Sequence, residues 1–279
     1  MPERTLAVLM TCFNRRASTL ACLGRLGEQA LPEDVRVQVY LTDDGSTDGT
    51  ADAVREAFPE VHLMSGDGNL YWSGGMRLAW RAALAQGHDF YLWLNDDTLL
   101  YPDALARLLD THAQLGSLAP LIVVGSTQDP LTQHTTYGGV TRSSRLHPAR
   151  FARVLPGHEP RPCQTMNGNC VLICRQVAER IGNLSEAFTH GMADYDYGLR
   201  AAQAGCSIWV APGHVGTCAN DHPRQSWRDP TVPRRHRWRQ VTSTKGLPPR
   251  EWGLFLKRHG GPLWPLYWLV PYARIWLGR

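Results

Sequence analysis

The first hundred residues alternate between two hydrophobic periods. Short apolar runs such as residues 6–10 and 90–94 are typical of strands that are buried on both faces, because no polar side alternates with the apolar one. Between these runs, apolar side chains return every three positions at Leu20, Leu23 and Leu26, which is the spacing of one helix face. The pattern predicts strands at 6–10, 35–41, 61–64 and 90–94, with a helix through Leu20–Leu26 and helices at 51–58 and 76–85 between them.

This order of strands and helices argues for an α/β fold with a doubly wound, mostly parallel sheet flanked by helices. Parallel strands end at the same edge of such a sheet, and ligands bind at that edge. The turns after three of the predicted strands are acidic or glycine-rich, at residues 42–50, 66–75 and 95–98. We therefore expect the functional site where these three turns meet.

The order changes after about Gly116. The later signals are strands at 121–124, 137–141, 170–174 and 208–211, with a helix through Tyr197–Ala204 and long polar loops between the strands. From Pro212 onward regularity fades into a Pro- and Trp-rich tail. We expect one domain in two halves, residues 1–115 and 116–225, followed by a basic, Trp-rich extension at 226–279.

The composition is that of an ordinary globular protein, with 43% hydrophobic and 19% charged residues among 279. The net charge of +4 is modest and gives no reason to expect a nucleic-acid partner. No apolar run approaches the roughly 18 residues of a membrane span, and the amino terminus lacks the pattern of a signal peptide. The seven cysteines are odd in number and form no CxxC pair, which argues against a zinc knuckle and predicts free thiols in the cytoplasm.

The sharpest chemical signal is the apolar run 91–94, which ends in Asn95, Asp96 and Asp97. Adjacent carboxylates at the end of a buried strand repel each other unless a cation or hydrogen-bond donors compensate them. A divalent metal that carries a nucleoside diphosphate would do so. The alternative is that Asp97 or Asp103 caps the helix expected near Pro102.

Three segments carry a resemblance to a known family: residues 43–48 (DDGSTD), 95–97 (NDD) and 194–196 (DYD), in that order. Together they resemble the family 2 glycosyltransferases with the GT-A fold, of the bacterial kind that builds cell-surface polysaccharides. The resemblance implies a mixed, mostly parallel sheet with an irregular helical C-terminal tail. It also implies metal-dependent, inverting transfer of one hexosyl or deoxyhexosyl unit from a UDP-, dTDP- or GDP-linked sugar to a hydroxyl of a glycan or lipid-linked acceptor.

The same resemblance gives roles to the two halves of the domain. Residues 1–115 would bind the nucleotide sugar, and residues 116–225 would bind the acceptor. Asp43 and Asp44 would hold the base and ribose, since the two oxygens of a carboxylate accept paired donors. The alternative is an Asx-type turn that supports the helix after it.

Residues 72–77 (WSGGMR) resemble the glycine-containing loop of the family. Gly74 and Gly75 would let the backbone approach the donor at the amino terminus of a helix. Arg77 would contact the diphosphate or the base, and Trp72 would face a sugar. The alternative is a structural turn with Arg77 on a solvated face.

Asp194 matches the family residue that removes the proton of the acceptor hydroxyl, although Ala193 stands where the family usually has glutamate. Asp196 would contact a sugar, or alternatively stabilise the first turn of its helix. Asn167 and Gly168 would lie against the donor sugar, or form a plain turn.

Asn95 departs from the DxD form of the family's metal motif. Asp97 is then the candidate metal ligand, and Asp96 would contact the ribose or the donor sugar. Oxygen ligands with room for phosphate oxygens suit Mn²⁺ or Mg²⁺, which would neutralise charge on the departing nucleoside diphosphate. We expect Asp44, Asp97 and Asp194 to converge on one cation-filled cleft.

Three features of the later chain leave alternatives open. His214 and His222 follow the last predicted strand, where some GT-A enzymes place a metal ligand, but a lone histidine is more often packed. Residues 234–238 (RRHRW) resemble the QxxRW signature of processive polysaccharide synthases without its first residue, and Trp238 would lie near the acceptor. The tail 264–279 either lies at the inner face of a membrane or packs onto the domain or onto a second subunit in a homodimer.

Two other classes compete with this interpretation. A sugar-phosphate nucleotidyltransferase would resemble Gly-x-Gly-x-Arg after its first strand, where this chain has residues 11–15 (TCFNR). A non-catalytic relative that binds carbohydrates or nucleotide sugars would account for Asn95 and Ala193 as marks of lost activity.

Overall fold

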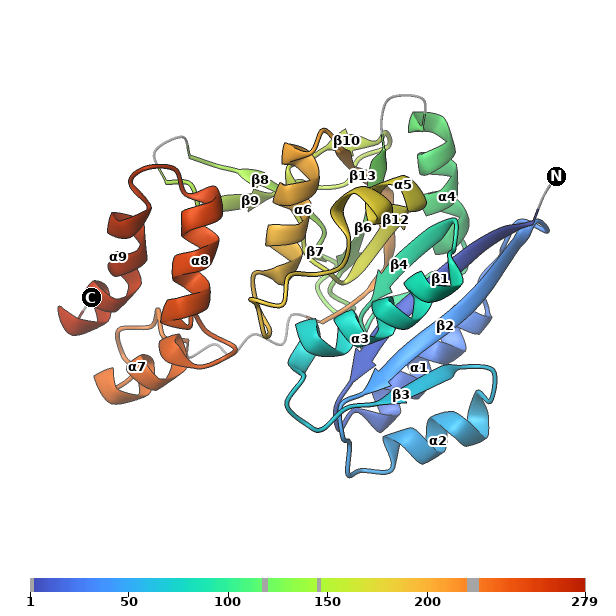
Figure 1. Ribbon diagram of the computed structural model, residues 1–279, viewed down its shortest axis with the longest axis horizontal. Helices are drawn as coiled ribbons and strands as arrows, with labels where there is room; N and C mark the ends of the chain where they lie inside the picture. The colour runs from blue at the N-terminus through green and yellow to red at the C-terminus, as the bar shows by residue number, and fades with distance from the viewer. Residues whose placement is uncertain (1–2, 117–119, 145–146, 220–225, 279) are drawn as a thin grey trace.

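The computed structural model describes residues 3–116, 120–144, 147–219 and 226–278. A mixed sheet of ten strands forms the centre of this part of the chain, with helices on both faces (Figure 1). Eight strands follow the order β10-β13-β6-β12-β4-β1-β2-β3, while β5 pairs with β13 and β7 with β6. The strands are β1 (Arg4–Cys12), β2 (Val35–Asp43), β3 (His62–Ser65), β4 (Phe90–Leu94), β5 (Leu99–Leu100), β6 (Leu121–Gln128), β7 (Thr135–Tyr137), β10 (Arg161–Pro162), β12 (Cys170–Cys174) and β13 (Ser207–Thr217).

The amino-terminal half of the sheet is parallel, which confirms the prediction from the hydrophobic pattern. β1 pairs with both β2 and β4, and β2 pairs with β3, all in parallel. Every residue of β4 is buried, as expected of a strand that helices cover on both sides. The carboxyl ends of β1, β2 and β4 therefore lie side by side, and the turns after them meet at one edge.

The second half of the sheet is mixed. β12 runs antiparallel between β4 and β6, and β13 runs parallel to β6. The strand expected at 137–141 is two strands, because β7 returns to β6 while the next strand joins a separate three-stranded sheet in the order β11-β8-β9. β13 continues beyond its predicted end at Ala211, with shifts in its register against β6. The second sheet contains β8 (Gly139–Arg142), β9 (Phe151–Arg153) and β11 (Thr165–Met166).

The helices between the strands agree with the predicted ones except at their ends, and α5 is an additional helix that was not predicted. They are α1 (Arg16–Gly27), α2 (Thr50–Ala57), α3 (Tyr71–Gln86), α4 (Ala104–Leu115), α5 (Arg175–Ile181) and α6 (Ala193–Gln203). α3 begins five residues earlier than the pattern predicts, so part of the expected glycine-rich turn is helical. Asp103 precedes α4 without capping it through its side chain, and its carboxylate pairs with Arg107 instead.

An aromatic cluster joins two helices to the central strand β4. Trp80 of α3, Trp93 of β4 and Tyr197 of α6 are fully buried. The ring centroids of Trp93 lie 5.5 Å from those of Trp80 and 5.1 Å from those of Tyr197, in edge-to-face arrangements. The cluster fixes α3 and α6 around the strand that ends in Asn95.

The carboxyl-terminal extension is more regular than expected. It forms α7 (Arg234–Thr242), α8 (Pro249–His259) and α9 (Trp264–Trp276), which lie beyond α6 at the end of the molecule opposite α2 (Figure 1). Prolines occupy the first turns of α8 and α9, where a missing N–H costs no helical hydrogen bond. The tail is helical, as predicted, and it is more regular than expected because those prolines start helices. Among the described residues, no helix is both long and apolar enough to cross a membrane.

Candidate active site

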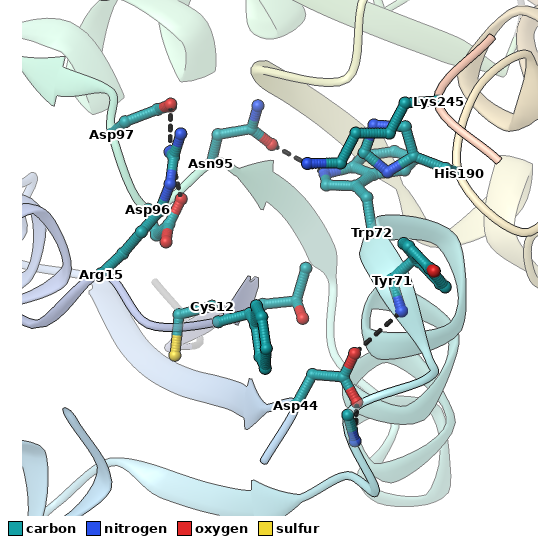
Figure 2. Close-up of a pocket in the computed structure, with 13 residues that line it drawn as sticks. Cys12, Arg15, Asp44, Tyr71, Trp72, Asn95, Asp96, Asp97, His190 and Lys245 are labelled. Carbon is teal, nitrogen blue, oxygen red and sulfur yellow. Dashed lines mark hydrogen bonds and ion pairs between the residues drawn. The ribbon is translucent and has the colours of Figure 1, made fainter. Parts of the chain in front are cut away.

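A cleft of about 370 Å³ opens at the carboxyl ends of β1, β2 and β4 (Figure 2). Its walls come from the polar turn after β1, the start of α3, the segment after β4 and two later loops. This is the edge at which the sequence pattern places the site. The lining residues are Thr11, Cys12, Phe13, Arg15, Asp44, Gly68, Tyr71, Trp72, Asn95, Asp96, Asp97, His190 and Lys245.

Asp96 and Asp97 face the cleft together, and Arg15 compensates their charge. One nitrogen of the Arg15 guanidinium donates to Asp96 Oδ1 at 3.2 Å and also to Asp97 Oδ2. Asp96 is only 6% exposed, and burial raises its pKa to about 7, with Asp97 adding to the rise and Arg15 opposing it. Neither carboxylate caps α4. The pair therefore lines the cleft with its charge partly compensated by a cation of the protein itself.

The donor set of this pair suits a hard divalent cation. Asp96 Oδ2 is buried and makes no hydrogen bond, so one carboxylate oxygen remains available beside the Asp97 carboxylate. Across the described ranges, no three side chains of His, Cys, Asp or Glu gather into a metal-binding group. Phosphate and water oxygens would have to complete the coordination, as they commonly do for Mg²⁺.

Asp44 also lines the cleft, and its carboxylate is already engaged by the backbone. Oδ1 accepts from the N–H groups of Gly68 at 3.0 Å and Leu70 at 3.2 Å, and Oδ2 accepts from that of Tyr71 at 2.9 Å. Asp44 thereby holds the start of α3 against the end of β2. The neighbouring Asp43 does not line the cleft, because its Oδ1 accepts from the N–H of Ser46 in an Asx-type turn.

Trp72 connects the cleft to the loop before β12. Its Nε1–H donates to Asn95 Oδ1 at 2.8 Å, which orients both side chains. A Cβ atom on Gly168 would lie 2.5 Å from the Trp72 ring and 3.5 Å from Cβ of Asp194. Only a glycine fits there, so Gly168 brings Trp72 and Asp194 together.

Asp194 lines a second cavity, of about 430 Å³, rather than the cleft itself. Its Oδ2 accepts from the Gly168 N–H at 3.1 Å and its Oδ1 from the Tyr195 N–H at 2.8 Å. Burial raises the pKa of Asp194 to about 6, and these backbone hydrogen bonds oppose the rise. His190 lines the cleft and Gly191 the second cavity, so the two spaces adjoin along one segment. The expected convergence thus holds for Asp44 and Asp97, with Asp194 in the adjoining space.

Gly74 and Gly75 serve packing, contrary to the expectation of a ligand-facing loop. Both lie inside α3, and neither lines the cleft. A side chain on Gly75 would overlap the Thr11 hydroxyl of β1, and one on Gly74 would press on Leu70. The carbonyl of Gly75 also accepts from the Thr42 hydroxyl of β2 at 2.9 Å. These glycines let α3 lie close to the sheet.

Four other predicted residues lie outside both cavities. Arg77 is turned toward the loop before α6, where its guanidinium donates to the carbonyls of Ser185 and Phe188. The Asn167 side chain accepts from the Gly138 N–H and donates to the Tyr195 hydroxyl. Trp238 packs its half-exposed ring edge-to-face on Tyr272. These three placements, and that of Asp196, do not support the predicted contacts with donor or acceptor.

Asp196 is fully buried in a cluster of basic groups. Its carboxylate accepts at 2.9 Å from each of Arg200, Arg258 and His259. Burial alone would raise the pKa of Asp196, but the three hydrogen bonds outweigh it and lower the pKa below its ordinary value. The cluster fastens α6 to α8, which is a structural role.

Of the two histidines considered as extra metal ligands, only His214 lies among the described residues. His214 Nε2 lies 2.9 Å from the Thr135 hydroxyl, and burial lowers the pKa of its imidazole. It lines neither cavity. His222 lies outside the described residues.

The cleft residues that sequence reasoning missed include Arg15, Tyr71, His190 and Lys245. Arg15 had a signal, because it belongs to the polar turn directly after β1. Tyr71 has a positive φ of 52°, which is uncommon for a residue with a side chain and frequent at functional sites. Burial, together with Lys245, lowers the pKa of His190 to about 4, so its imidazole is neutral at pH 7. Lys245 brings a positive charge from the extension and had no sequence signal.

Comparison with protein families gives a match that spans most of the chain. The model of glycosyl transferase family 2 matches residues 7–182. A curated relative, the N-acetylglucosaminyl-diphospho-decaprenol L-rhamnosyltransferase of Mycobacterium tuberculosis, is 28% identical over 214 residues, which is 68% of this chain and 69% of that protein.

Two solved structures resemble this one. The mannosyltransferase PcManGT from Pyrobaculum calidifontis, in complex with GDP-Man and Mn²⁺, gives a TM-score of 0.57 at 17% identity, covering 99% of this chain and 70% of that one. GalNAc-T7 with UDP, GalNAc and Mn²⁺ also gives 0.57, at 14% identity, over 76% of this chain and 43% of that one. At such identities the likeness concerns the fold.

Proposed function

Because this chain belongs to glycosyl transferase family 2 and has the GT-A fold, we propose that it transfers a single sugar from a nucleoside diphosphate to a hydroxyl of a glycan or lipid-linked acceptor. The chain is a glycosyltransferase, and the proposal concerns its donor, its acceptor and its site residues. One observation carries the proposal. Asp44, Asp96 and Asp97 share a cleft that adjoins the cavity of Asp194, with Trp72 and Gly168 at the junction.

The donor would occupy the cleft. Its nucleoside would lie along Asp44, Tyr71 and the exposed Phe13, and its diphosphate would lie near Lys245 and the carboxylate pair. Asp97 and the free oxygen of Asp96 would hold Mn²⁺ or Mg²⁺, which when bound neutralises charge on the departing diphosphate. The nucleotide and Mn²⁺ in the two similar structures support this assignment, while the identity of the base stays open between uridine, thymidine and guanosine.

The acceptor would occupy the second cavity. With a pKa of about 6, the Asp194 carboxylate is ionised at neutral pH and accepts the proton of the acceptor hydroxyl. The hydroxyl oxygen then bonds to the anomeric carbon from the side opposite the diphosphate, as the bond from that carbon to the diphosphate oxygen breaks. This single displacement inverts the anomeric configuration, and Trp72 with Gly168 keeps the two reactants adjacent.

The three chain regions would divide this work. Residues 1–115 would bind the nucleotide sugar and residues 116–225 would supply the base. The extension 226–279 contributes to both spaces, with Lys245 in the cleft and α8 and α9 in the cavity. The name of the rhamnosyltransferase relative supports a hexosyl or deoxyhexosyl donor and a lipid-linked acceptor. A role in surface polysaccharide synthesis and a place at the inner face of a membrane are part of the same proposal.

Donor turnover without an acceptor tests the proposal. Purified protein is incubated with UDP-, GDP- and dTDP-linked sugars, with and without Mn²⁺, and released nucleoside diphosphate is measured. We expect slow, Mn²⁺-dependent hydrolysis of one donor, lost in Asp97→Asn and kept in Asp103→Asn, a nearby carboxylate outside the cleft. Release from no donor, or equal release by Asp97→Asn, would overturn the donor assignment. Once an acceptor is found, a product that keeps the donor's anomeric configuration would overturn the single displacement.

A further inference from the structure

The outer side of α9 is the most concentrated apolar surface of the described chain. Ten large hydrophobic side chains are exposed among all the described residues, and five of these ten lie within residues 263–277. They are Leu263, Leu266, Leu269, Trp276 and Leu277, between 52% and 76% exposed. Leu263, Leu266 and Leu269 recur every third position, and Trp276 follows seven residues after Leu269, which is the spacing of one helix face. Leu277 directly follows Trp276 at the end of the helix.

The inner side of the same helix forms part of the cavity that contains Asp194. Tyr267, Val270, Pro271 and Arg274 line that cavity. The helix is fixed there, because the Tyr272 hydroxyl donates to the Leu247 carbonyl at 2.7 Å. One helix therefore carries an outer apolar face and a wall of the proposed acceptor cavity.

The charge of this region is strongly positive. Residues 226–279 contain eleven Lys and Arg and only two Asp and Glu, a net charge of +9, whereas residues 1–225 carry −5. Arg234, Arg235 and Arg239 of α7 are exposed and share a groove with Trp276 of α9. Positive charge thus lies directly beside the apolar face.

We propose that α7 and α9 dock onto the surface of an anionic phospholipid bilayer. The leucines and Trp276 of α9 would enter the boundary between headgroups and acyl chains, where amphipathic helices bind. The arginines of α7 would lie against the anionic headgroups, which attract basic residues near the surface. Tryptophan and arginine are suited to this depth, since each has an apolar body and a polar end.

Charge favours a bilayer over a second copy of the chain as the occupant of this face. A symmetric dimer would bring two such faces together and place the arginines of both copies near each other. Like charges at that distance repel. An anionic bilayer complements both the apolar and the basic part.

This docking also explains how an acceptor would reach Asp194, a consequence that rests on the proposed function. A lipid anchor held in the bilayer under α9 places its polar head at the level of that helix. The cavity on the other side of α9 then receives the head without extraction of the anchor from the membrane.

Vesicle flotation tests the docking without donor or acceptor, so its result does not depend on the proposed function. The full chain is mixed with vesicles of phosphatidylcholine containing a quarter phosphatidylglycerol, and with vesicles of phosphatidylcholine alone. We expect flotation with the anionic vesicles that weakens at high salt. Two variants, Leu266→Ser/Leu269→Ser and Arg235→Glu/Arg239→Glu, should each bind about tenfold more weakly or worse.

Matched controls separate docking from general surface effects. Leu131→Ser/Leu155→Ser changes two exposed leucines elsewhere on the molecule, and Arg55→Glu/Arg81→Glu reverses the charge of two exposed arginines on α2 and α3. Both controls should float like the original protein, and all variants should keep its melting temperature and donor hydrolysis. Absence of flotation by the original protein, or equal flotation by test and control variants, would overturn the proposal. A concentration-dependent dimer that only the α9 variant abolishes would also overturn it, in favour of a second copy.

Discussion

Replacing Gly168 by alanine probes the contact that joins the donor cleft to Asp194. The new Cβ would lie 2.5 Å from Cζ2 and 2.6 Å from Cη2 of Trp72. Ordinary carbon contacts are about 3.5–4.0 Å, so the ring must retreat by about 1 Å. Its Nε1–H bond to Asn95 and its edge-to-face packing on Trp93 oppose that movement.

The size of the effect follows from these contacts. Overpacking costs about 1–3 kcal/mol, and a lost hydrogen bond about 0.5–1.5 kcal/mol. The Trp72 ring either stays overpacked or gives up its hydrogen bond, whichever costs less. We therefore expect the free energy of unfolding to fall by about 1–3 kcal/mol, which leaves the protein folded. Donor hydrolysis should fall about a hundredfold, because a displacement of about 1 Å at a reacting centre has that effect.

Two measurements on Gly168→Ala check this reasoning: urea unfolding, and donor hydrolysis at saturating donor. Gly191→Ala is the matched control, since nothing lies within 4 Å of a Cβ at that nearby glycine. In a Trp72→Ala background the clash is absent, and the Gly168 substitution should then change little. The reasoning is refuted if Gly168→Ala turns over like Gly191→Ala, or if its cost is the same with and without the Trp72 ring.

The remaining predictions concern charge and packing. Asp97→Asn should abolish Mn²⁺-dependent turnover while circular dichroism and melting temperature stay unchanged; a loss of fold would assign Asp97 a structural role. Turnover should rise as pH passes through about 6, because the Asp194 base works only when it is deprotonated, and an acid limb near pH 4 would contradict this. Gly75→Ala should lower the free energy of unfolding by about 1–3 kcal/mol in urea titrations, whereas Gly24→Ala, which meets nothing within 4 Å, should not. Asp196→Asn should cost about 3–5 kcal/mol at neutral pH. Because the pKa of Asp196 is lowered in the folded protein, its carboxylate stabilises the fold fully above the ordinary carboxyl pKa, and this stabilisation is lost as the pH falls through the pKa in the folded state. A destabilisation by Asp196→Asn that became larger in acid would contradict this reasoning.

The sequence pattern predicted the part of the fold in which local periodicity is strong. β1 and β4 are apolar runs that are largely or wholly buried, β2 alternates apolar and polar residues over its first half, and the helices between the strands repeat apolar positions at helical spacing. The extension was predicted to be helical but irregular, because prolines within α8 and α9 resemble helix breakers in the sequence. Pro249 and Pro265 stand in first turns, where the helix needs no N–H, and this only becomes evident once the helix start is known.

The candidate site shows the same division. Asp44, Asp96 and Asp97 were placed in one cleft because the ends of parallel strands must meet, a rule that needs no side-chain detail. Asp196 and Arg77 were assigned to ligands although their partners are other parts of the protein. Arg200 lies four residues from Asp196, at the spacing of a local helical ion pair, but Arg258 lies 62 residues away along the chain. The Arg77 acceptors are backbone carbonyls, so the pairings with Arg258 and with those carbonyls leave no mark in the local sequence.

Locating Mn²⁺ and a nucleoside diphosphate in crystals of the protein tests the central claim most directly. The account predicts an anomalous manganese peak within bonding distance of the Asp97 carboxylate, with the diphosphate in the cleft between Asp97 and Tyr71. Crystals of Asp97→Asn grown under the same conditions should lack the peak. A nucleotide bound elsewhere, or a manganese peak that Asp97→Asn retains, would contradict the claim.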